Sequence, residues 1–331
     1  MLLLLTLACA GPVDDLFFVA HDDAVLPVNV RGAVDSGTVL IYVQGGPGYP
    51  SIDMREVGFV DWETRLEPHV GVAYYDQRGT GNALGDYRIE DMTVDQWVGD
   101  LDAVTRAVRD RYTPERIVWL SHSWGGYLAA LGLLDTDAPV DAWISVNGTV
   151  SYVDAYIHQR RRDFVARVAQ ERMDAGDSDP FWTDAQAWAQ ANPTVEDDAA
   201  VEALGDYLDG IWIRLGADEP ALDTGPLLRA VFWSHYDALD SHLRPANVIS
   251  VLWPQYDDTD LLPRMGTVEV PTLLINGSWD DIVPDEIAQD LADAIGPERA
   301  TLVRIPQAGH TPFTEQPEPF GEATLSFVES L

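Results

Sequence analysis

The stretch Ser121-His122-Ser123-Trp124-Gly125-Gly126 decides how this chain is interpreted. The apolar run at residues 116–120 predicts a buried strand before it, and the pattern at residues 124–134 predicts a helix after it. A serine on so tight a strand-to-helix turn is held exposed in a strained conformation, and the residues two places before and after it must be small. Ser and Gly stand at those places. We therefore predict that Ser123 is a nucleophile.

A serine hydroxyl becomes a useful nucleophile only when a base removes its proton. In proteins with this kind of turn, the base is a histidine after the last strand of the sheet. The chain has seven histidines, and only His310 follows the predicted last strand at residues 301–305. We therefore expect His310, in Gly309-His310-Thr311, to be the base.

The base needs an acid that orients the imidazole and stabilises its charged form. The run Asn276-Gly277-Ser278-Trp279-Asp280-Asp281 follows a predicted strand at residues 270–276, and the order Ser, Asp, His is the one expected here. Asp280, three residues after Gly277, is favoured as the acid. Asp281 is the alternative, although it is also placed to cap the next helix.

Acyl transfer also requires two N–H donors for the developing oxyanion. The N–H of Trp124 follows the nucleophile directly. The run Gly45-Gly46-Pro47-Gly48 comes after the predicted strand Thr38–Val43, and glycine lets the backbone approach a substrate closely. We assign the second donor to Gly46.

Apolar runs alternate with helical patterns along most of the chain, which predicts an α/β fold with a mostly parallel sheet flanked by helices. The alternation stops between residues 147 and 265, where the patterns are helical, and then resumes. We therefore expect a core built from residues 13–146 and 266–331, interrupted by a helical insertion at residues 147–265 that acts as a lid. The predicted strands are 16–20, 24–30, Thr38–Val43, 70–75, 116–120, 140–146, 270–276 and 301–305, and the predicted helices are 93–112, 124–134, 284–295 and one after Pro319.

The charge balance excludes one class of partner. The net charge is −35, with 20 arginines and no lysine. A field of this sign repels nucleic acid and anionic membrane surfaces, so nucleic-acid binding is discarded. A saline habitat and a genome that favours arginine codons explain the composition equally well.

The first twelve residues contain a short apolar run followed by a cysteine. Cys9 is the sole cysteine, so an intrachain disulfide is excluded. It follows a short apolar run, as in a bacterial lipoprotein signal, where lipidation of the cysteine would tether the protein to a membrane. This interpretation favours the bacterial cell envelope or secretion. The alternative is a frayed apolar N-terminus on a cytoplasmic protein.

Together these residues resemble the proline iminopeptidase family of serine peptidases and related hydrolases. The resemblance implies the α/β-hydrolase fold, a helical lid between the sixth and seventh strands of the main sheet, and no cofactor; we expect no metal either. It also implies that the loop containing Arg78 supports the site without taking part in catalysis. The matching stretches are Gln44-Gly45-Gly46-Pro47-Gly48, Asp76-Gln77-Arg78-Gly79-Thr80-Gly81, residues 121–126, Gly277-Ser278-Trp279-Asp280 and Gly309-His310.

The chain departs from that family in the insertion. Family aminopeptidases hold the free α-amine of the substrate with lid glutamates, but Trp233 stands before His235-Tyr236 and Gln190 follows Trp188-Ala189 here. Gln44 also replaces the usual histidine. We therefore expect hydrolysis of an ester or amide of a small substrate, with Trp233 as a substrate-binding residue. The alternatives are an aminopeptidase acting on short peptides and a non-catalytic binding protein of the same fold.

Overall fold

The computed structural model describes residues 12–56, 60–215 and 238–331, and the side chains of all of these except residues 56 and 238–245. Cys9 and Trp233, both singled out by the sequence, lie outside the described residues.

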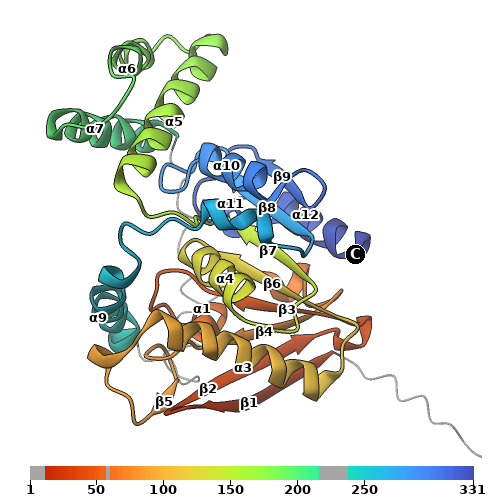
Figure 1. The fold of residues 1–331 in the computed structure, drawn as a ribbon. Helices are drawn as coiled ribbons and strands as arrows, with labels where there is room; N and C mark the ends of the chain where they lie inside the picture. The colour runs from red at the N-terminus through yellow and green to blue at the C-terminus, as the bar shows by residue number, and fades with distance from the viewer. Residues whose placement is uncertain (1–11, 57–59, 216–237) are drawn as a thin grey trace, which may run out of the picture.

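One twisted sheet organises the chain (Figure 1). Its strand order is β1-β2-β4-β3-β6-β7-β8-β9, and the short strand β5 pairs with β2. The first pairings, β1 with β2 and β2 with β4, are antiparallel, and those from β4 through β3 to β9 are parallel. The strands are β1 (Val13–His21), β2 (Ala24–Gly32), β3 (Thr38–Val43), β4 (Gly71–Tyr75), β5 (Leu84–Gly85), β6 (Arg116–His122), β7 (Ala142–Val146), β8 (Thr272–Gly277) and β9 (Ala300–Ile305).

Helices cover both faces of the sheet because its central strands are apolar on both sides. In β3, Val39 and Ile41 belong to a core shared with one set of helices, and Leu40 and Tyr42 belong to a core on the opposite face. The first face carries α3 (Val94–Tyr112), α4 (Trp124–Asp135) and α10 (Asp285–Ile295), and the second carries α2 (Trp62–Arg65) and α12 (Pro317–Ser330). The predicted α/β architecture is confirmed.

The N-terminus of α3 shows how local sequence sets an element boundary. Thr93 accepts a hydrogen bond from the N–H of Gln96 at 3.2 Å, and the Gln96 side chain accepts from the N–H of Thr93 at 3.0 Å. This reciprocal pair satisfies two N–H groups that the helix leaves open. The short elements α1 (Ser51–Glu56), β5 and α11 (Pro312–Glu315) were not predicted, because they are too short to carry a periodic pattern.

The insertion between β7 and β8 is helical, as expected. Its described helices are α5 (Asp154–Asp174), α6 (Pro180–Ala191), α7 (Asp198–Leu215) and α9 (Ala238–Tyr256). Helices α5 to α7 enclose an apolar core of their own and project away from the sheet above α10, whereas α9 lies beside α3 (Figure 1). An isolated bridge between Ser151 and Asp260 joins the points where the insertion leaves and rejoins the core.

None of the described helices is both long enough and apolar enough to cross a membrane.

Candidate active site

Ser123 occupies the turn between β6 and α4 with φ 54° and ψ −125°, a positive-φ backbone conformation that non-glycine residues rarely adopt. The N–H of Ser123 donates to the carbonyl of Val146 at 3.0 Å, and its own carbonyl accepts from Gly126 at 2.9 Å. A Cβ at position 125 would lie 2.1 Å from the carbonyl oxygen of Val43, so the turn requires glycine there. These contacts hold Ser123 in its strained conformation and keep the hydroxyl at the carboxyl end of β6.

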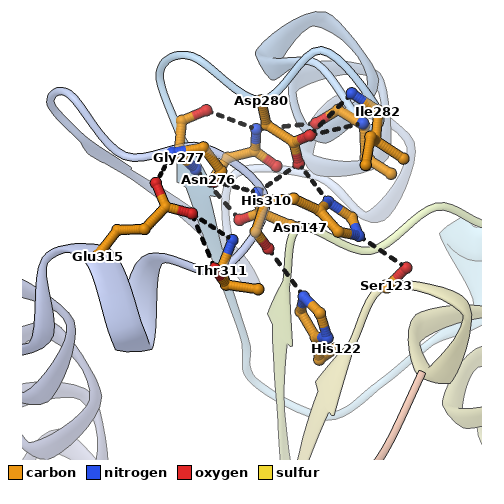
Figure 2. A network of polar contacts seen from close by, with 12 residues as sticks. His122, Ser123, Asn147, Asn276, Gly277, Asp280, Ile282, His310, Thr311 and Glu315 are labelled. Atoms are coloured by element: carbon orange, nitrogen blue, oxygen red, sulfur yellow. Dashed lines mark hydrogen bonds and ion pairs between the residues drawn. The ribbon is translucent and has the colours of Figure 1, made fainter. Parts of the chain in front are cut away.

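The three residues predicted to act together are brought together (Figure 2). His310 Nε2 lies 3.0 Å from Ser123 Oγ, and His310 Nδ1 lies 2.8 Å from Asp280 Oδ2. Asp280 follows β8 and His310 follows β9, so both stand at the edge of the sheet where the parallel strands end. Both distances are those of hydrogen bonds, as the predicted roles of nucleophile, base and acid require.

The structure also distinguishes the two neighbouring aspartates. Asp280 is fully buried, and its Oδ1 accepts hydrogen bonds from the N–H groups of Ile282 at 2.9 Å and Val283 at 3.0 Å. Asp281 is half-buried and makes no hydrogen bond to His310. Burial and the adjacent Asp280 raise the pKa of Asp281 above its ordinary value.

The electrostatics of the site raise the pKa of His310 and lower that of His122. Burial opposes the imidazolium of His310, but attraction to Asp280, the hydrogen bond between them, and the charges of Asp281 and Glu315 outweigh it and raise its pKa. Burial, followed by repulsion from His310, lowers the pKa of His122 to about 3. His122 is therefore neutral near pH 7, and its Nε2 carries the proton that it donates to the His310 carbonyl at 2.8 Å.

The loop around His310 is held by residues that the sequence did not indicate. Glu315 accepts from the N–H of Gly309 and from the N–H of Thr311, the latter at 3.0 Å. Asn147 Nδ2 donates to the Gly309 carbonyl at 2.9 Å and also to Asp280 Oδ2. The peptide groups on both sides of His310 are thereby fixed, as Figure 2 shows.

The glycine loop after β3 lies against the nucleophile turn. A Cβ at Gly45 would come within 2.7 Å of the His122 carbonyl and 2.9 Å of Ser123 Cβ, and Gly46 has φ 117°. In the described part of the chain, no acceptor is hydrogen-bonded to the N–H of Gly46 or of Trp124. The two predicted oxyanion donors are therefore both uncommitted.

The loop after β4 is hydrogen-bonded to the glycine loop and to α3. Gln77 Nε2 donates to the Gln44 carbonyl at 3.2 Å, which fixes the start of the glycine loop. Arg78 is fully buried and donates from Nε and Nη2 to the two carboxylate oxygens of Asp100 at 3.0 and 2.9 Å. Arg78 thus binds α3, and in the described part of the chain no hydrogen bond joins it to Ser123.

The described residues contain no group of three or more His, Cys, Asp or Glu side chains that could hold a metal ion.

Comparison with known proteins gives the family. A model described as alpha/beta hydrolase fold matches residues 38–317. This chain belongs to that family. The chain is 29% identical to a pimeloyl-[acyl-carrier protein] methyl ester esterase of Edwardsiella ictaluri over 216 residues, covering 65% of this chain and 70% of that one. It is 27% identical to the putative carbamate hydrolase RutD of Enterobacter cloacae over 267 residues, covering 80% and 84%.

Solved structures share the fold of this α/β hydrolase. The proline iminopeptidase of Mycobacterium smegmatis superposes with a TM-score of 0.64 at 19% identity, covering 96% of this chain and 98% of that one. The esterase EaEST of Exiguobacterium antarcticum gives a TM-score of 0.60 at 17% identity, covering 94% and 98%. At these identities the likeness concerns the fold alone.

Proposed function

We propose that this α/β hydrolase is a serine hydrolase that cleaves an ester or amide bond of a small substrate through a Ser123-His310-Asp280 triad. The observation that carries the proposal is the continuous hydrogen-bonded chain from Ser123 Oγ through His310 to Asp280, with both contacts at 3.0 Å or less. A non-catalytic binding protein would not need this chain, nor a strained serine at its end.

The geometry suggests the course of the reaction. Ser123 Oγ attacks the carbonyl carbon of the substrate while its proton passes to His310 Nε2, and Asp280 holds the imidazolium through Nδ1–H. The N–H groups of Gly46 and Trp124 stabilise the oxyanion. His310 then protonates the leaving group, which departs from a Ser123 acyl-enzyme, and a water activated by His310 releases the acid product.

We propose that an aromatic cluster around Trp124, the residue after Ser123, forms an apolar side of the substrate site. The ring of Trp124 lies 5.7 Å from that of Tyr256 of α9, which in turn lies 4.7 Å from Tyr152 and 5.3 Å from Trp253. Trp253 is 42% exposed, so the cluster reaches solvent. Apolar walls with few polar groups are typical of small-molecule sites. The curated relatives are named as a methyl ester esterase and a putative carbamate hydrolase, which supports cleavage of an ester or amide bond.

The second candidate is an aminopeptidase that releases N-terminal residues from short peptides. It is favoured by the Gly45-Gly46-Pro47-Gly48 run and the Asp76-Gln77-Arg78-Gly79 run, which occur together and in order. The buried ammonium of a peptide substrate would need carboxylates placed for it, because an unpaired buried charge is costly. Trp233 and Gln190 stand where such acids were expected, so the esterase or amidase activity is preferred.

The deciding experiment uses three substrates and one inactive variant. We expect kcat/KM to be higher for a short-chain p-nitrophenyl ester than for a proline arylamide or its N-acetylated form. Ser123→Ala should abolish turnover and fluorophosphonate labelling without changing the melting temperature. Continued labelling of Ser123→Ala would overturn the assignment of the nucleophile, and a large advantage of the free-amine proline substrate would establish the aminopeptidase instead.

We also propose that residues 1–12 are a lipoprotein-type signal that places the enzyme in the bacterial cell envelope. The support is the apolar run before Cys9. Mass spectrometry of the cell-derived protein should find a diacylglycerol thioether on Cys9 as the new N-terminus. An unmodified N-terminal peptide beginning at Met1 would overturn this proposal and leave the hydrolase assignment untouched.

A further inference from the structure

The first helix of the insertion, α5, binds the loop that carries Asp280. Arg161 donates from Nε and Nη2 to the carbonyl oxygen of Ile282 at 3.3 and 3.0 Å. Arg167 donates from Nη2 to the carbonyl oxygen of Ser278 at 3.3 Å. These carbonyls lie two residues after and two residues before Asp280, so α5 holds the loop on both sides of the acid.

An apolar contact joins the same two segments. Trp279, which directly precedes Asp280, packs against the core formed by α5 to α7 rather than against the cores on the faces of the sheet. Its N–H donates to the carbonyl of Ala308 at 2.8 Å, in the loop that leads to His310. The acid loop is therefore built partly from the insertion and partly from the sheet.

Helix α5 is itself fixed to the core. Arg160 forms a two-pronged ion pair with Asp290 of α10, with N–O distances of 2.6 and 3.2 Å, and Arg167 Nε lies 2.8 Å from Glu286 Oε1. Paired donors of this geometry restrict rotation as well as separation. Helix α5 is thus a fixed support against which the loop that carries Asp280 can be held.

Arg161 differs from its neighbours on α5. Among the described residues, no carboxylate lies within ion-pair distance of its guanidinium, whereas Arg160 pairs with Asp290 and Arg162 with Asp163. Its donors go to the Ile282 carbonyl, and the N–H of Ile282 donates to Asp280 Oδ1 at 2.9 Å. Ile282 is therefore held at its carbonyl by the insertion while its N–H orients the acid; Figure 2 shows the latter contact.

We propose that Arg161 is a positioning residue for Asp280: by holding Ile282 it keeps the carboxylate on His310 Nδ1, so that the helical insertion sets the geometry of the triad. This inference rests on the proposed serine hydrolase function. It assigns the insertion a part in catalysis, because displacement of α5 would move the acid.

The test is a double-mutant cycle between Arg161 and Asp280. We expect Arg161→Met to lower kcat for a p-nitrophenyl ester about 10-fold with little change in KM, since a displacement of about 1 Å in a catalytic group costs up to about 100-fold. In an Asp280→Asn background, the same substitution should cost almost nothing more, because the group through which Arg161 acts is already lost. Arg161→Lys keeps a donor and a charge and should recover most of kcat.

Arg162→Met is the matched control. Arg162 is on the same helix but binds the carbonyls of Ala189 and Asn192 and the carboxylate of Asp163, all within the insertion. It should leave kcat unchanged even if the melting temperature falls. If Arg161→Met does not fold, the comparison of Arg161→Lys with Arg161→Gln replaces it, with kcat lower for Gln.

Two results would overturn the inference: equal kcat for the Arg161 and Arg162 variants, or a full additional loss from Arg161→Met on top of Asp280→Asn. Failure of the proposed function looks different, because the unmodified protein would then show neither ester hydrolysis nor labelling of Ser123.

Discussion

His122 Nε2 lies 2.8 Å from the carbonyl oxygen of His310, and the centroids of the two imidazole rings are 4.9 Å apart. His122, which directly precedes Ser123, therefore supports the backbone of His310. Phe313 packs edge-on against His122 at 5.0 Å and keeps its ring in place. Since His122 is neutral, it contributes a hydrogen-bond donor and no charge to the site.

His122→Ala should lower kcat about 10-fold, because the His310 loop loses a donor and gains space, and small displacements of a base are costly. His122→Gln places an amide N–H near the lost Nε2–H and should restore most of the activity. The measurement is kcat for a p-nitrophenyl ester in both variants, with melting temperatures as the control for folding. Equal kcat for the Ala and Gln variants would show that the donated hydrogen bond is not what matters.

His122 also predicts a pH dependence of stability. Its pKa is lowered from 6.5 to about 3 in the folded protein, so between these values the unfolded chain binds more protons than the folded one. The free energy of unfolding should therefore fall as pH drops below about 6.5, by up to about 1.4 kcal/mol per pH unit from this group. The free energy of unfolding, measured with urea, should have a smaller slope against pH in His122→Gln than in the unmodified protein over that range. An unchanged slope would mean that His122 is not buried in its neutral form.

Glu315 should tune the pH profile of activity. Its charge helps to raise the pKa of His310, and its oxygens accept from the N–H groups of Gly309 and Thr311. In Glu315→Gln the pKa of His310 falls, so His310 stays a free base at lower pH and the acid limb of kcat/KM moves to lower pH. The maximal rate should fall as well, since an amide group cannot accept both bonds. Glu318→Gln, an exposed neighbour, is the control; an acid limb that moves equally in both variants would contradict the prediction.

The neighbouring aspartates give a paired comparison. Asp280→Asn should lower kcat by about 10⁴, because an amide beside Nδ1 favours the wrong tautomer of His310. Asp281→Asn should cost less than tenfold, since Asp281 makes no hydrogen bond to the base. Steady-state kinetics of the two variants at saturating ester are sufficient. Comparable losses would remove the distinction that the geometry makes between them.

The sequence could predict which residues the candidate site brings together where chemistry limits the choice of residue. Ser123, Asp280 and His310 each follow a strand whose apolar run is readable, and parallel strands end at one edge. Asn147 and Glu315 were not predicted, because their roles arise from contacts with Asp280 and Gly309 across 133 and 6 residues of chain, which no local pattern encodes. An asparagine directly after a buried strand, at the edge where Ser123 stands, is the signal that could have indicated the first of them.

The insertion was predicted to be helical, but the different contacts that its helices make with the core were not predicted. Apolar residues at helical spacing gave helices between residues 147 and 265. Nothing in that pattern indicates that α5 binds the Asp280 loop. Nor does it indicate that α9 packs against α3 and α4, with Tyr256 beside Trp124. From the sequence alone, an arginine such as Arg161 is expected to be a solvated charge. The backbone carbonyl that it binds comes from a segment far away in the sequence, and only the structure reveals that contact.

The last prediction concerns the glycine loop that supplies one oxyanion donor. The backbone of Gly45 does not have a positive φ, so Gly45→Ala carries no intrinsic strain, but the added Cβ would come within 2.7 Å of the His122 carbonyl and 2.9 Å of Ser123 Cβ. Neither atom can retreat without disturbing the nucleophile turn, so the glycine loop must shift and carry the N–H of Gly46 away from the oxyanion. Loss of one such donor costs about 10²–10³ in kcat.

We therefore expect kcat for a p-nitrophenyl ester to fall about 100-fold in Gly45→Ala, with the protein still folded. Gly205→Ala is the matched control, since a Cβ there on α7 would meet nothing within 4 Å and alanine favours the helix. That variant should keep full activity and melt at the same or a slightly higher temperature. Full activity in Gly45→Ala would mean that the loop can yield without moving Gly46, and the second oxyanion donor would then have to be sought elsewhere.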